Sequence, residues 1–377
     1  MQIGFDAKRA FTNTSGLGNY SRFVIAALQK QFPQNNYFLY TTRQAEIFQQ
    51  FLPPVPQVQL VKPTGLYRLL PDVWRLGGLV NSIEKFELDI FHGLSNELPF
   101  FFKKTKARRV VTIHDLIYLR FPELYKPHDR VIYNAKFRSA CQSADKIIAI
   151  SRQTQADLMQ FYNIAPEKIE VIYQDCNPIF HQRATAAVLQ TVKEKYRLPD
   201  KFLLSVGTLE RRKNHLHFLK AWLQSSLTDT HDIVLIGKKL PYTAQIENFI
   251  QENNLTGKVH ILPYIPFQEL PAIYQLAQVF VYPSLFEGFG IPILEGMNSG
   301  VPVVTSTGSC FTEAGGEAAL YAEPNDLAQL ANQLVVASTD QAVRNRMIEA
   351  GYDQAKKFRA EHTIPQINQV YETLLGR

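Results

Sequence analysis

Short apolar runs alternate with longer helical patterns along the whole chain. In the first half, strands are expected at residues 2–5, 37–40, 58–61, 89–92, 109–113, 146–150 and 168–173. In the second half, they are expected at residues 202–206, 233–236, 259–262, 279–282, 301–305 and 319–321. Strands separated by helices are typical of parallel sheets that carry helices on both faces. The pattern therefore predicts an α/β chain with two doubly wound sheets.

The length of the chain favours two domains, because 377 residues exceed the size at which a single core usually keeps growing. Residues 178–201 are polar and mostly lack strand character, with a helical pattern at 187–196, so the connection between the domains is expected there. Ligands of open α/β sheets bind outside the carboxyl ends of the strands. Two such domains facing one another would form a cleft lined by strand ends from both.

A run with two glutamates, VYPSLFEGFGIPILEGMNSG at residues 281–300, contains the end of one of these strands. The strand breaks into a loop that holds Glu287. A helix is expected to open at Pro292, because proline suits a first helical turn, and to close at Gly300. Glu295 then lies about one turn inside the helix, beside an N-terminus that attracts phosphate. Carboxylates next to a phosphate site suit a ligand such as a sugar nucleotide, which has hydroxyls at both ends and phosphate between them.

An ordinary strand, turn and helix with two solvated glutamates is the alternative, since the spacing alone often arises by chance. The surrounding residues, PSLFEGFGIP followed by EGM and GVPVV, resemble the donor-site signature of retaining GT-B glycosyltransferases of family 4. The resemblance implies two Rossmann-like domains that face a central cleft. The acceptor-side domain would comprise residues 1–180 and a C-terminal helix at 360–377 that crosses back to it, and the nucleotide-sugar-binding domain residues 195–355.

The activity implied by this resemblance is the transfer of a hexose from a nucleoside-diphosphate sugar to a hydroxyl of a glycan or lipid-linked glycan in cell-surface polysaccharide synthesis. Arg212 and Lys213, in VGTLERRKN at 206–214, would hold the leaving diphosphate, and such preorganised charge is usually the largest catalytic term. Glu287 would position hydroxyls of the donor sugar, and Glu295 those of the ribose. The other residues implied to bind the donor are Gly207, Tyr264, Ile265, Gly288, Phe289, Gly290 and Ile291.

Residues of the first half are implied to face the acceptor and the donor phosphates. His114 ends an almost wholly apolar strand, and its counterpart in the family contacts the transferred sugar and the diphosphate region. His92 ends another strand, although a lone histidine is more often structural. Gly16 and Gly18 lie in the loop at 14–22, where glycine lets backbone amides approach a ligand. Ser151 matches an acceptor-side serine, but a helix N-cap explains it equally well.

A required metal ion is not expected. The chain lacks Asp-x-Asp, the acidic element by which GT-A enzymes usually hold a metal on the donor diphosphate, and Arg212 and Lys213 can supply that charge. Its three cysteines are far apart in sequence, which suggests buried free thiols rather than a zinc site. His215 and His217 lack acidic or cysteine partners, so a metal pair is not favoured there. GDP-mannose is the favoured donor by general resemblance, with UDP-linked hexoses next.

The net charge of +6 is concentrated at residues 66–76 and 100–109, where leucine and aromatic side chains mix with cations. Such segments suit contact with an anionic bilayer, which would give access to a polyprenyl-diphosphate-linked acceptor. Cleft-side charge with core aromatics is the alternative. We find neither a membrane-spanning run nor a signal peptide, so the expected location is cytoplasmic, with peripheral contact to the inner face of the cell membrane. Nucleic acid is not an expected partner.

Three other functions share part of this pattern. A nucleotide-sugar epimerase or hydrolase of the same architecture would need no acceptor. A nicotinamide-dependent dehydrogenase would need a full glycine fingerprint, but Ser21 stands at the position of the third glycine. The third is a non-catalytic subunit that binds the sugar nucleotide. One departure from the family is YQDCNP at residues 173–178 in place of the more usual Asn-Gly-Val-Asp, which puts the acceptor in doubt.

Overall fold

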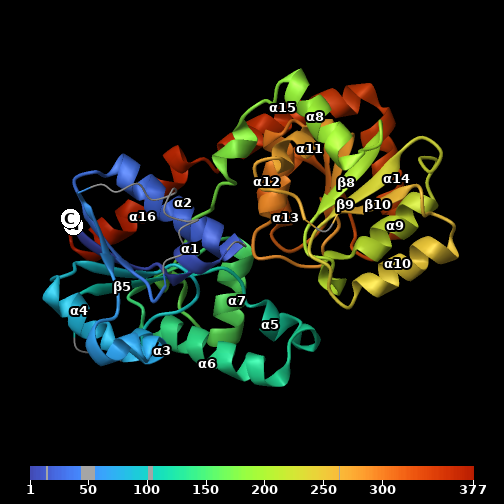
Figure 1. Cartoon of the computed structure of the whole chain (residues 1–377). Coiled ribbons are helices and arrows are strands. Elements are labelled where there is room, and N and C mark those ends of the chain that lie inside the picture. The colour runs from blue at the N-terminus through green and yellow to red at the C-terminus, as the bar shows by residue number, and fades with distance from the viewer. Residues whose placement is uncertain (14–15, 44–55, 101–104, 263) are drawn as a thin grey trace. The chain divides into compact units, whose positions relative to one another are not determined.

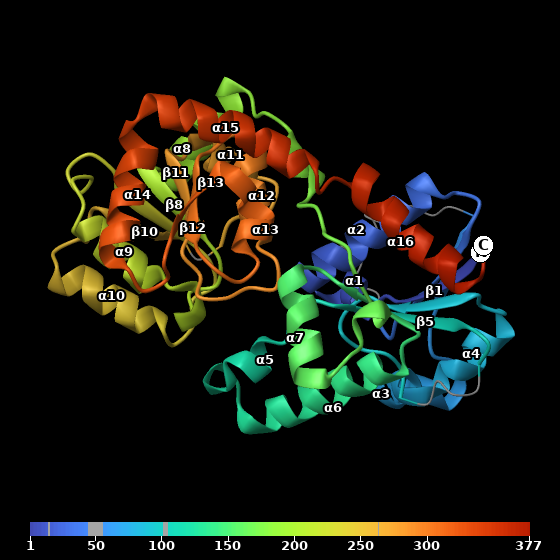
Figure 2. The ribbon, with the colours of Figure 1, turned by 180° about the vertical axis from the view of Figure 1, so that it is seen from behind.

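The computed structural model describes residues 1–13, 16–43, 56–100, 105–262 and 264–377. The chain divides into two compact units, one formed by Met1–Gln174 with Ala360–Arg377 and the other by Asp175–Arg359. Each unit is a parallel sheet with helices on both faces (Figures 1 and 2). Residues 178–201, where the connection was expected, belong to the second unit, and the division falls shortly before them.

Seven parallel strands form the sheet of the first unit, in the order β3-β2-β1-β4-β5-β6-β7. They are β1 (Gln2–Asp6), β2 (Asn36–Tyr40), β3 (Val58–Val61), β4 (Ile90–Gly93), β5 (Arg108–Ile113), β6 (Lys146–Ala149) and β7 (Ile169–Val171). The order reverses at β1, which pairs with both β2 and β4. Ligands of such sheets bind at this switch point, beyond the carboxyl ends of the strands.

The helices of this unit are α1 (Lys8–Thr12), α2 (Gly16–Gln31), α3 (Pro71–Val73), α4 (Val80–Lys85), α5 (Ile117–Arg120), α6 (Pro127–Ser143), α7 (Arg152–Tyr162) and α16 (Ala360–Leu374). Helices α4, α6 and α7 share a core with the strands, in which Ile83 and Phe137 join Phe91. Successive strand residues face opposite sides of a sheet, so His92 faces the other side, where it contacts Tyr371 of α16. On that side α2 and α16 pack together (Figures 1 and 2).

Six parallel strands form the sheet of the second unit, in the order β10-β9-β8-β11-β12-β13. They are β8 (Phe202–Val206), β9 (Asp232–Ile236), β10 (Val259–Leu262), β11 (Val279–Tyr282), β12 (Val303–Ser306) and β13 (Ala319–Ala322). Its helices are α8 (Ala186–Tyr196), α9 (His215–Leu223), α10 (Thr243–Glu252), α11 (Leu270–Leu276), α12 (Ile291–Asn298), α13 (Phe311–Gly315), α14 (Leu327–Thr339) and α15 (Gln341–Lys356). Helices α9, α10 and α14 form one core with the strands, through residues such as Trp222, Ile246 and Leu334.

Helix α12 lies close to its sheet because Gly296 has no side chain. A Cβ at that position would come within 3.0 Å of Phe280 Cδ1 on β11 and 3.1 Å of Val303 Cγ2 on β12. A larger residue would force the helix or these side chains to move. The glycine therefore fixes the height of α12, and with it the neighbouring Glu295, above the sheet.

The predicted α/β architecture is confirmed. Each strand expected from the apolar runs is present, and its ends differ from the expected ones by at most two residues. The helix predicted to open at Pro292 is α12, and Gly300 follows its end with φ +70. The C-terminal helix α16 packs in the first unit, as the family resemblance implied.

Among the described residues, no helix combines the length and the apolar character that crossing a bilayer requires. All three cysteines, Cys141, Cys176 and Cys310, are buried free thiols, as expected.

Candidate active site

Two cations and a carboxylate meet beyond the carboxyl ends of β8 and β11. Arg212 and Lys213 lie in one 3-10 turn that follows β8, and Glu287 lies in the loop that follows β11. Glu287 Oε1 is 2.6 Å from Lys213 Nζ and 2.5 Å from Arg212 Nη1. Lys213 Nζ also donates to the Tyr282 hydroxyl at 2.7 Å. The structure thus brings together three of the residues implied to hold the donor.

Arg212 links the two loops. Its Nη1 donates to Phe286 O at 2.7 Å, in the loop of Glu287, and its Nη2 donates to Glu210 Oε1 at 2.6 Å. The formal charges of Arg212, Lys213, Glu210 and Glu287 therefore cancel. The Glu210 side chain is 32% exposed, whereas that of Glu287 is 11% exposed. A phosphate can therefore displace Glu210 from Arg212 more easily than it can displace Glu287.

Burial and pairing together set the charges of this cluster. Burial alone would raise the pKa of Glu287, but Arg212 and Lys213 outweigh it and lower the pKa to about 2. Burial works to lower the pKa of Arg212, but Glu287 and Glu210 outweigh it, so this pKa is raised. Burial lowers the pKa of Lys213, and Glu287 opposes that shift. At neutral pH, Glu287 is a carboxylate held by two cations, which makes it a weak base.

The loop after Glu287 leads directly into α12. Gly290 is the N-cap of that helix and has φ +104, in the left-handed region that favours glycine. The Phe289 side chain is 2% exposed and packs against Phe358, with ring centroids 5.4 Å apart. A ligand beside residues 288–291, from Gly288 to Ile291, would therefore meet backbone and the positive end of the helix dipole.

Glu295 lies on α12 and is 9% exposed. The Tyr274 hydroxyl donates to its Oε2 at 2.9 Å. Burial raises the pKa of Glu295 to about 7, against the lowering effect of the hydrogen bond from Tyr274. Glu295 therefore changes its charge near neutral pH, whereas Glu287 stays ionised.

Three more implied donor residues follow strands β8 and β10 of this unit. Gly207 follows β8, and a Cβ there would lie 3.5 Å from Lys213 Cε. Tyr264 and Ile265 follow β10, with Tyr264 77% exposed and Ile265 buried. Pro263, between them and β10, lies outside the described residues.

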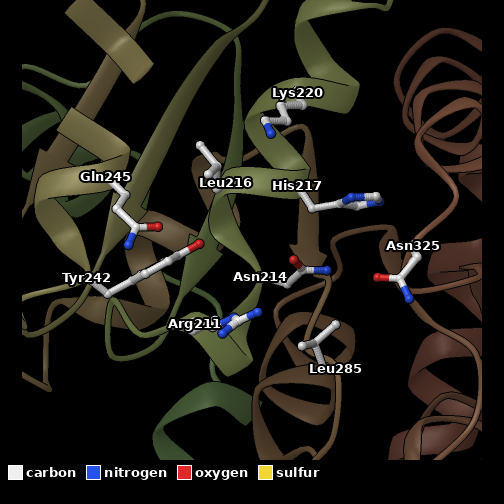
Figure 3. Close-up of a pocket in the computed structure, with 9 residues that line it drawn as sticks. All are labelled: Arg211, Asn214, Leu216, His217, Lys220, Tyr242, Gln245, Leu285 and Asn325. Carbon is white, nitrogen blue, oxygen red and sulfur yellow. The ribbon is translucent and has the colours of Figure 1, made fainter. Parts of the chain in front are cut away.

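A pocket of about 390 Å³ lies between α9, α10 and the loop that carries the cations (Figure 3). It is lined by Arg211, Asn214, Leu216, His217, Lys220, Tyr242, Gln245, Leu285 and Asn325. Its volume is typical of small-ligand sites. The residues implied to bind the donor are not among its lining, because Arg211 faces the pocket while Arg212 and Lys213 turn to Glu287.

In the first unit, His114 lies just beyond the end of β5 and is 6% exposed. Its Nε2 is 2.9 Å from Leu94 O, and because a carbonyl oxygen can only accept, Nε2 carries the hydrogen. Burial lowers the pKa of His114 to about 4, although the Leu94 bond raises it. The ring is therefore neutral at neutral pH, with Nδ1 as the hydrogen-bond acceptor. The Tyr20 ring packs edge-on against it at 4.7 Å.

His92 has a structural role in the core of the first unit. It is fully buried, with Nδ1 2.6 Å from the Tyr371 hydroxyl and Nε2 2.8 Å from Thr112 Oγ1. Burial, and then the nearby His114, lower the pKa of His92 to about 3, so it is neutral. These bonds connect α16 to β4 and β5.

The other candidates of the first unit lie at helix starts. Gly16 begins α2 and has open space around it, whereas a Cβ at Gly18 would overlap Asn13 O at 1.9 Å. Close packing therefore explains Gly18 without a ligand. Ser151 is the N-cap of α7, is fully buried, and accepts from Thr154 N at 3.0 Å, which is the capping alternative.

Comparison with known proteins bears on both units. The family described as Glycosyl transferases group 1 matches residues 190–354, and Glycosyltransferase Family 4 matches residues 14–174. O-antigen chain mannosyltransferase B of Escherichia coli is 32% identical over 76% of this chain and 74% of its own length. The chain belongs to glycosyltransferase family 4.

Two further relatives extend this result. Serotype-specific mannosyltransferase WbdA of Escherichia coli is 30% identical over 67% of this glycosyltransferase, which corresponds to 32% of the longer WbdA chain. A crystal structure of Anabaena Alr3699/HepE in complex with UDP and glucose has a TM-score of 0.76 at 18% identity, over 99% of this chain and 100% of that one. The structural likeness confirms the predicted GT-B fold.

Two tyrosines of this glycosyltransferase were missed at the sequence level. Tyr282 binds Lys213 and Tyr274 binds Glu295 through their hydroxyls. Tyr282 is the last residue of β11, and a polar group at the carboxyl end of an apolar strand is a signal that could have identified it. Tyr274 lies inside α11, where its spacing resembles that of any core residue.

Replacing Glu295 by glutamine should flatten the pH dependence of stability. The pKa of about 7 lies above the ordinary 4.5, so the folded protein keeps a proton that the unfolded chain releases. The stabilising effect is complete below about pH 4.5 and is lost as the pH rises through about 7, on the order of 3 kcal/mol in total. Between about pH 5 and about pH 8, the melting temperature of the wild type should therefore fall more than that of Glu295→Gln.

Glu247→Gln is the matched control, because the Glu247 side chain on α10 is 44% exposed and pairs with Lys239. It should keep the wild-type pH profile. Parallel profiles for the wild type and Glu295→Gln would show that Glu295 does not titrate near neutral pH.

Proposed function

We propose that this glycosyltransferase moves a hexose, with mannose favoured, from a nucleoside-diphosphate sugar to a hydroxyl of a glycan or lipid-linked glycan in cell-surface polysaccharide synthesis. The observation that carries the proposal is the buried contact of Glu287 with Arg212 and Lys213 at strand ends of the second unit. GDP-mannose is the favoured donor because two relatives are named mannosyltransferases. The HepE complex makes a UDP-linked hexose the second candidate.

In this proposal Arg212 and Lys213 bind the donor diphosphate. The diphosphate displaces the more exposed Glu210 from Arg212, while Glu287 keeps both cations in place and accepts hydrogen bonds from donor-sugar hydroxyls. Glu295 accepts hydrogen bonds from the ribose, and Tyr264 and Ile265 meet the base through their backbone. Preorganised charges in a buried site stabilise the developing diphosphate strongly, because little reorganisation is needed during the reaction.

The transfer replaces one bond to the anomeric carbon by another. The bond between this carbon and the diphosphate oxygen breaks, and its electron pair stays on the diphosphate. The acceptor hydroxyl oxygen bonds to the same carbon, and its proton goes to the departing diphosphate oxygen. Because Glu287 is paired with two cations, we assign it no covalent role, and we assign retention of configuration to attack from the face that the diphosphate leaves.

His114 has the form of a hydrogen-bond acceptor in this proposal. Its Nε2 hydrogen is committed to Leu94 O, so Nδ1 can accept from a hydroxyl of the transferred sugar but cannot donate a proton to it. Gly16, at the start of α2, is proposed to approach the acceptor and the donor phosphates. The proposal needs no divalent metal on the diphosphate, because Arg212 and Lys213 supply positive charge there.

Lys213→Ala should lower turnover by about a hundredfold, since losing a charged hydrogen bond to the developing diphosphate costs on the order of 3 kcal/mol. The fold should survive, because Arg212 still neutralises Glu287.

Thermal shifts with GDP, UDP, ADP and their sugars identify the donor, because a ligand of the folded state raises its melting temperature. Release of the nucleoside diphosphate, with a glycan-lipid extract as acceptor source, then measures turnover.

Lys356→Ala is the control for this experiment, because Lys356 is an exposed lysine of the same unit that pairs with Asp353 at 2.8 Å. It should keep wild-type turnover, and the same result for Lys213→Ala would refute the assigned role. Free sugar or an isomerised nucleotide sugar formed at full rate without acceptor would favour the epimerase or hydrolase. Donor binding with no turnover would favour the non-catalytic subunit.

An exposed apolar strip in the first unit supports peripheral membrane contact, which we also propose. The strip contains four exposed large residues: Leu66 is 75% exposed, Leu69 79%, Leu70 50% and Val73 50%. Adjacent exposed apolar residues of this size often mark a contact surface. A protein that rests on the inner face of the cell membrane could reach a polyprenyl-diphosphate-linked acceptor.

The charged part of this surface is smaller than the sequence indicated. Arg75 and Arg109 form ion pairs within the unit, at 2.5 Å and 2.9 Å, so they are unsuited to bind lipid headgroups. Arg68 is exposed within the strip. Residues 101–104, which hold part of the second basic segment, lie outside the described residues.

Exchange of Leu66, Leu69 and Leu70 for serine should weaken binding to vesicles that contain phosphatidylglycerol. A leucine side chain contributes about 1.5–3 kcal/mol when it is fully buried from water. Losing part of this contribution at each of the three positions should weaken binding by about tenfold or more. Co-sedimentation at low salt measures this. Val131→Ser with Ile132→Ser, which changes exposed residues of α6, is the control and should bind like the wild type. If the wild-type protein stays in the supernatant, the proposed membrane contact is contradicted.

A further inference from the structure

Three potential metal ligands lie together at the start of the second unit. Asp175, Cys176 and His181 each offer one donor atom, and these atoms lie within 4.8 Å of one another. Asp175 and Cys176 belong to the departure YQDCNP, and His181 ends the 3-10 turn that follows it. The spacing Asp-Cys-x4-His is not a familiar zinc pattern, so a metal site was not expected there.

Two of the three distances between these atoms are close to the edges of a metal tetrahedron. His181 Nε2 is 3.4 Å from Asp175 Oδ1 and 3.8 Å from Cys176 Sγ. In a tetrahedral zinc site with ordinary bond lengths, nitrogen and oxygen ligands lie about 3.3 Å apart, and nitrogen and sulfur about 3.6 Å apart. All three ligand atoms lie within 4.8 Å of one another, so one ion could contact them after the atoms move closer together.

Burial leaves part of this group unsatisfied without an ion. Asp175 and Cys176 are 6% and 1% exposed, and Asp175 Oδ1 is a buried atom that makes no hydrogen bond with the described part of the chain. Its contact with His181 Nε2, at 3.4 Å, is too long for a strong hydrogen bond, so the carboxylate is incompletely compensated for the water that it loses. The His181 side chain is 19% exposed, which gives an ion a route from solvent.

The group is coupled to the helix that carries Glu295. Asn298, the last residue of α12, donates through Nδ2 to Cys176 Sγ at 3.3 Å and to Leu294 O at 3.0 Å. Arg183, shortly after His181, donates to Ser299 O at 2.6 Å. The segment that begins the second unit is thus attached to the C-terminal end of α12.

We infer that Asp175, Cys176 and His181 bind a divalent transition metal of borderline softness, with Zn²⁺ as the reference ion and water as a fourth ligand. Thiolate, imidazole and carboxylate are the ligand types that Zn²⁺ takes in proteins. On binding, the Cys176 thiol releases its proton to solvent, and Zn²⁺ with one thiolate and one carboxylate has no net charge, which suits a buried site. The ion would fasten residues 175–181 to α12 and has no part in the proposed transfer step.

Metal binding can be measured directly on the full-length protein without a histidine tag. After chelation and desalting, Co²⁺ should bind with one equivalent per chain and produce a sulfur-to-cobalt charge-transfer band. Zn²⁺ should displace it and raise the melting temperature. Cys176→Ser should lose the band, and His181→Gln should weaken Co²⁺ binding by about tenfold or more, the scale at which even outer-shell partners of a metal act.

Cys141→Ser is the matched control, because Cys141 is a buried thiol of the first unit. It should bind Co²⁺ like the wild type. The inference is overturned if wild-type protein shows no charge-transfer band at one equivalent of Co²⁺, or if Cys176→Ser and His181→Gln bind the ion as the wild type does. If Cys176→Ser does not fold, the Co²⁺ binding of His181→Gln alone tests the inference. None of these readouts depends on glycosyl transfer, so the two proposals can fail separately.

Discussion

The ion cluster of Glu287 with Arg212 and Lys213 is the constraint on which the proposed donor site depends. Moving these charges out of water costs several kcal/mol per ion, and only close pairing offsets that cost. Apolar side chains of similar size often stabilise such a position as well or better, so stability alone does not explain the cluster. Its formal charges cancel, which means that the resting site holds both cations in place without an uncompensated buried charge.

The fold positions this cluster by ordinary packing rules. Parallel strands end at one edge of each sheet, and the loops after β8 and β11 meet there because these strands are neighbours. Gly296 lets α12 approach β11 and β12, and Gly290 gives the preceding loop the left-handed turn that starts the helix. Glu287 and Glu295 thus come from one loop and one helix but have opposite electrostatic environments. Cations surround Glu287, whereas Glu295 has a tyrosine hydroxyl and buried surroundings, so only Glu295 titrates near neutral pH.

Much of the fold could be predicted because its signals are local. An apolar run such as residues 279–282 indicates a strand by itself. In the same way, the proline at the start of α12 and the glycine after its end indicate a helix within a few residues. Contacts between distant segments could not be predicted in this way. The hydroxyls of Tyr282 and Tyr274 bind residues of the site. The position of Tyr282 at the end of an apolar strand was a usable signal, whereas no local pattern distinguishes Tyr274 from a core tyrosine. The role of His92 also depends on Tyr371, which is 279 residues away. The group of Asp175, Cys176 and His181 could not be predicted from the sequence, because its spacing is irregular and only folding brings its atoms together.

A crystal structure of the protein with the nucleoside diphosphate selected by thermal shift tests the central claim most directly. The account predicts that the terminal phosphate lies within hydrogen-bond distance of Lys213 Nζ and the Arg212 guanidinium, with Glu210 displaced and the ribose hydroxyls on Glu295. A diphosphate held instead by Arg211 and Lys220 in the neighbouring pocket, with Glu210 still bound to Arg212, would contradict it.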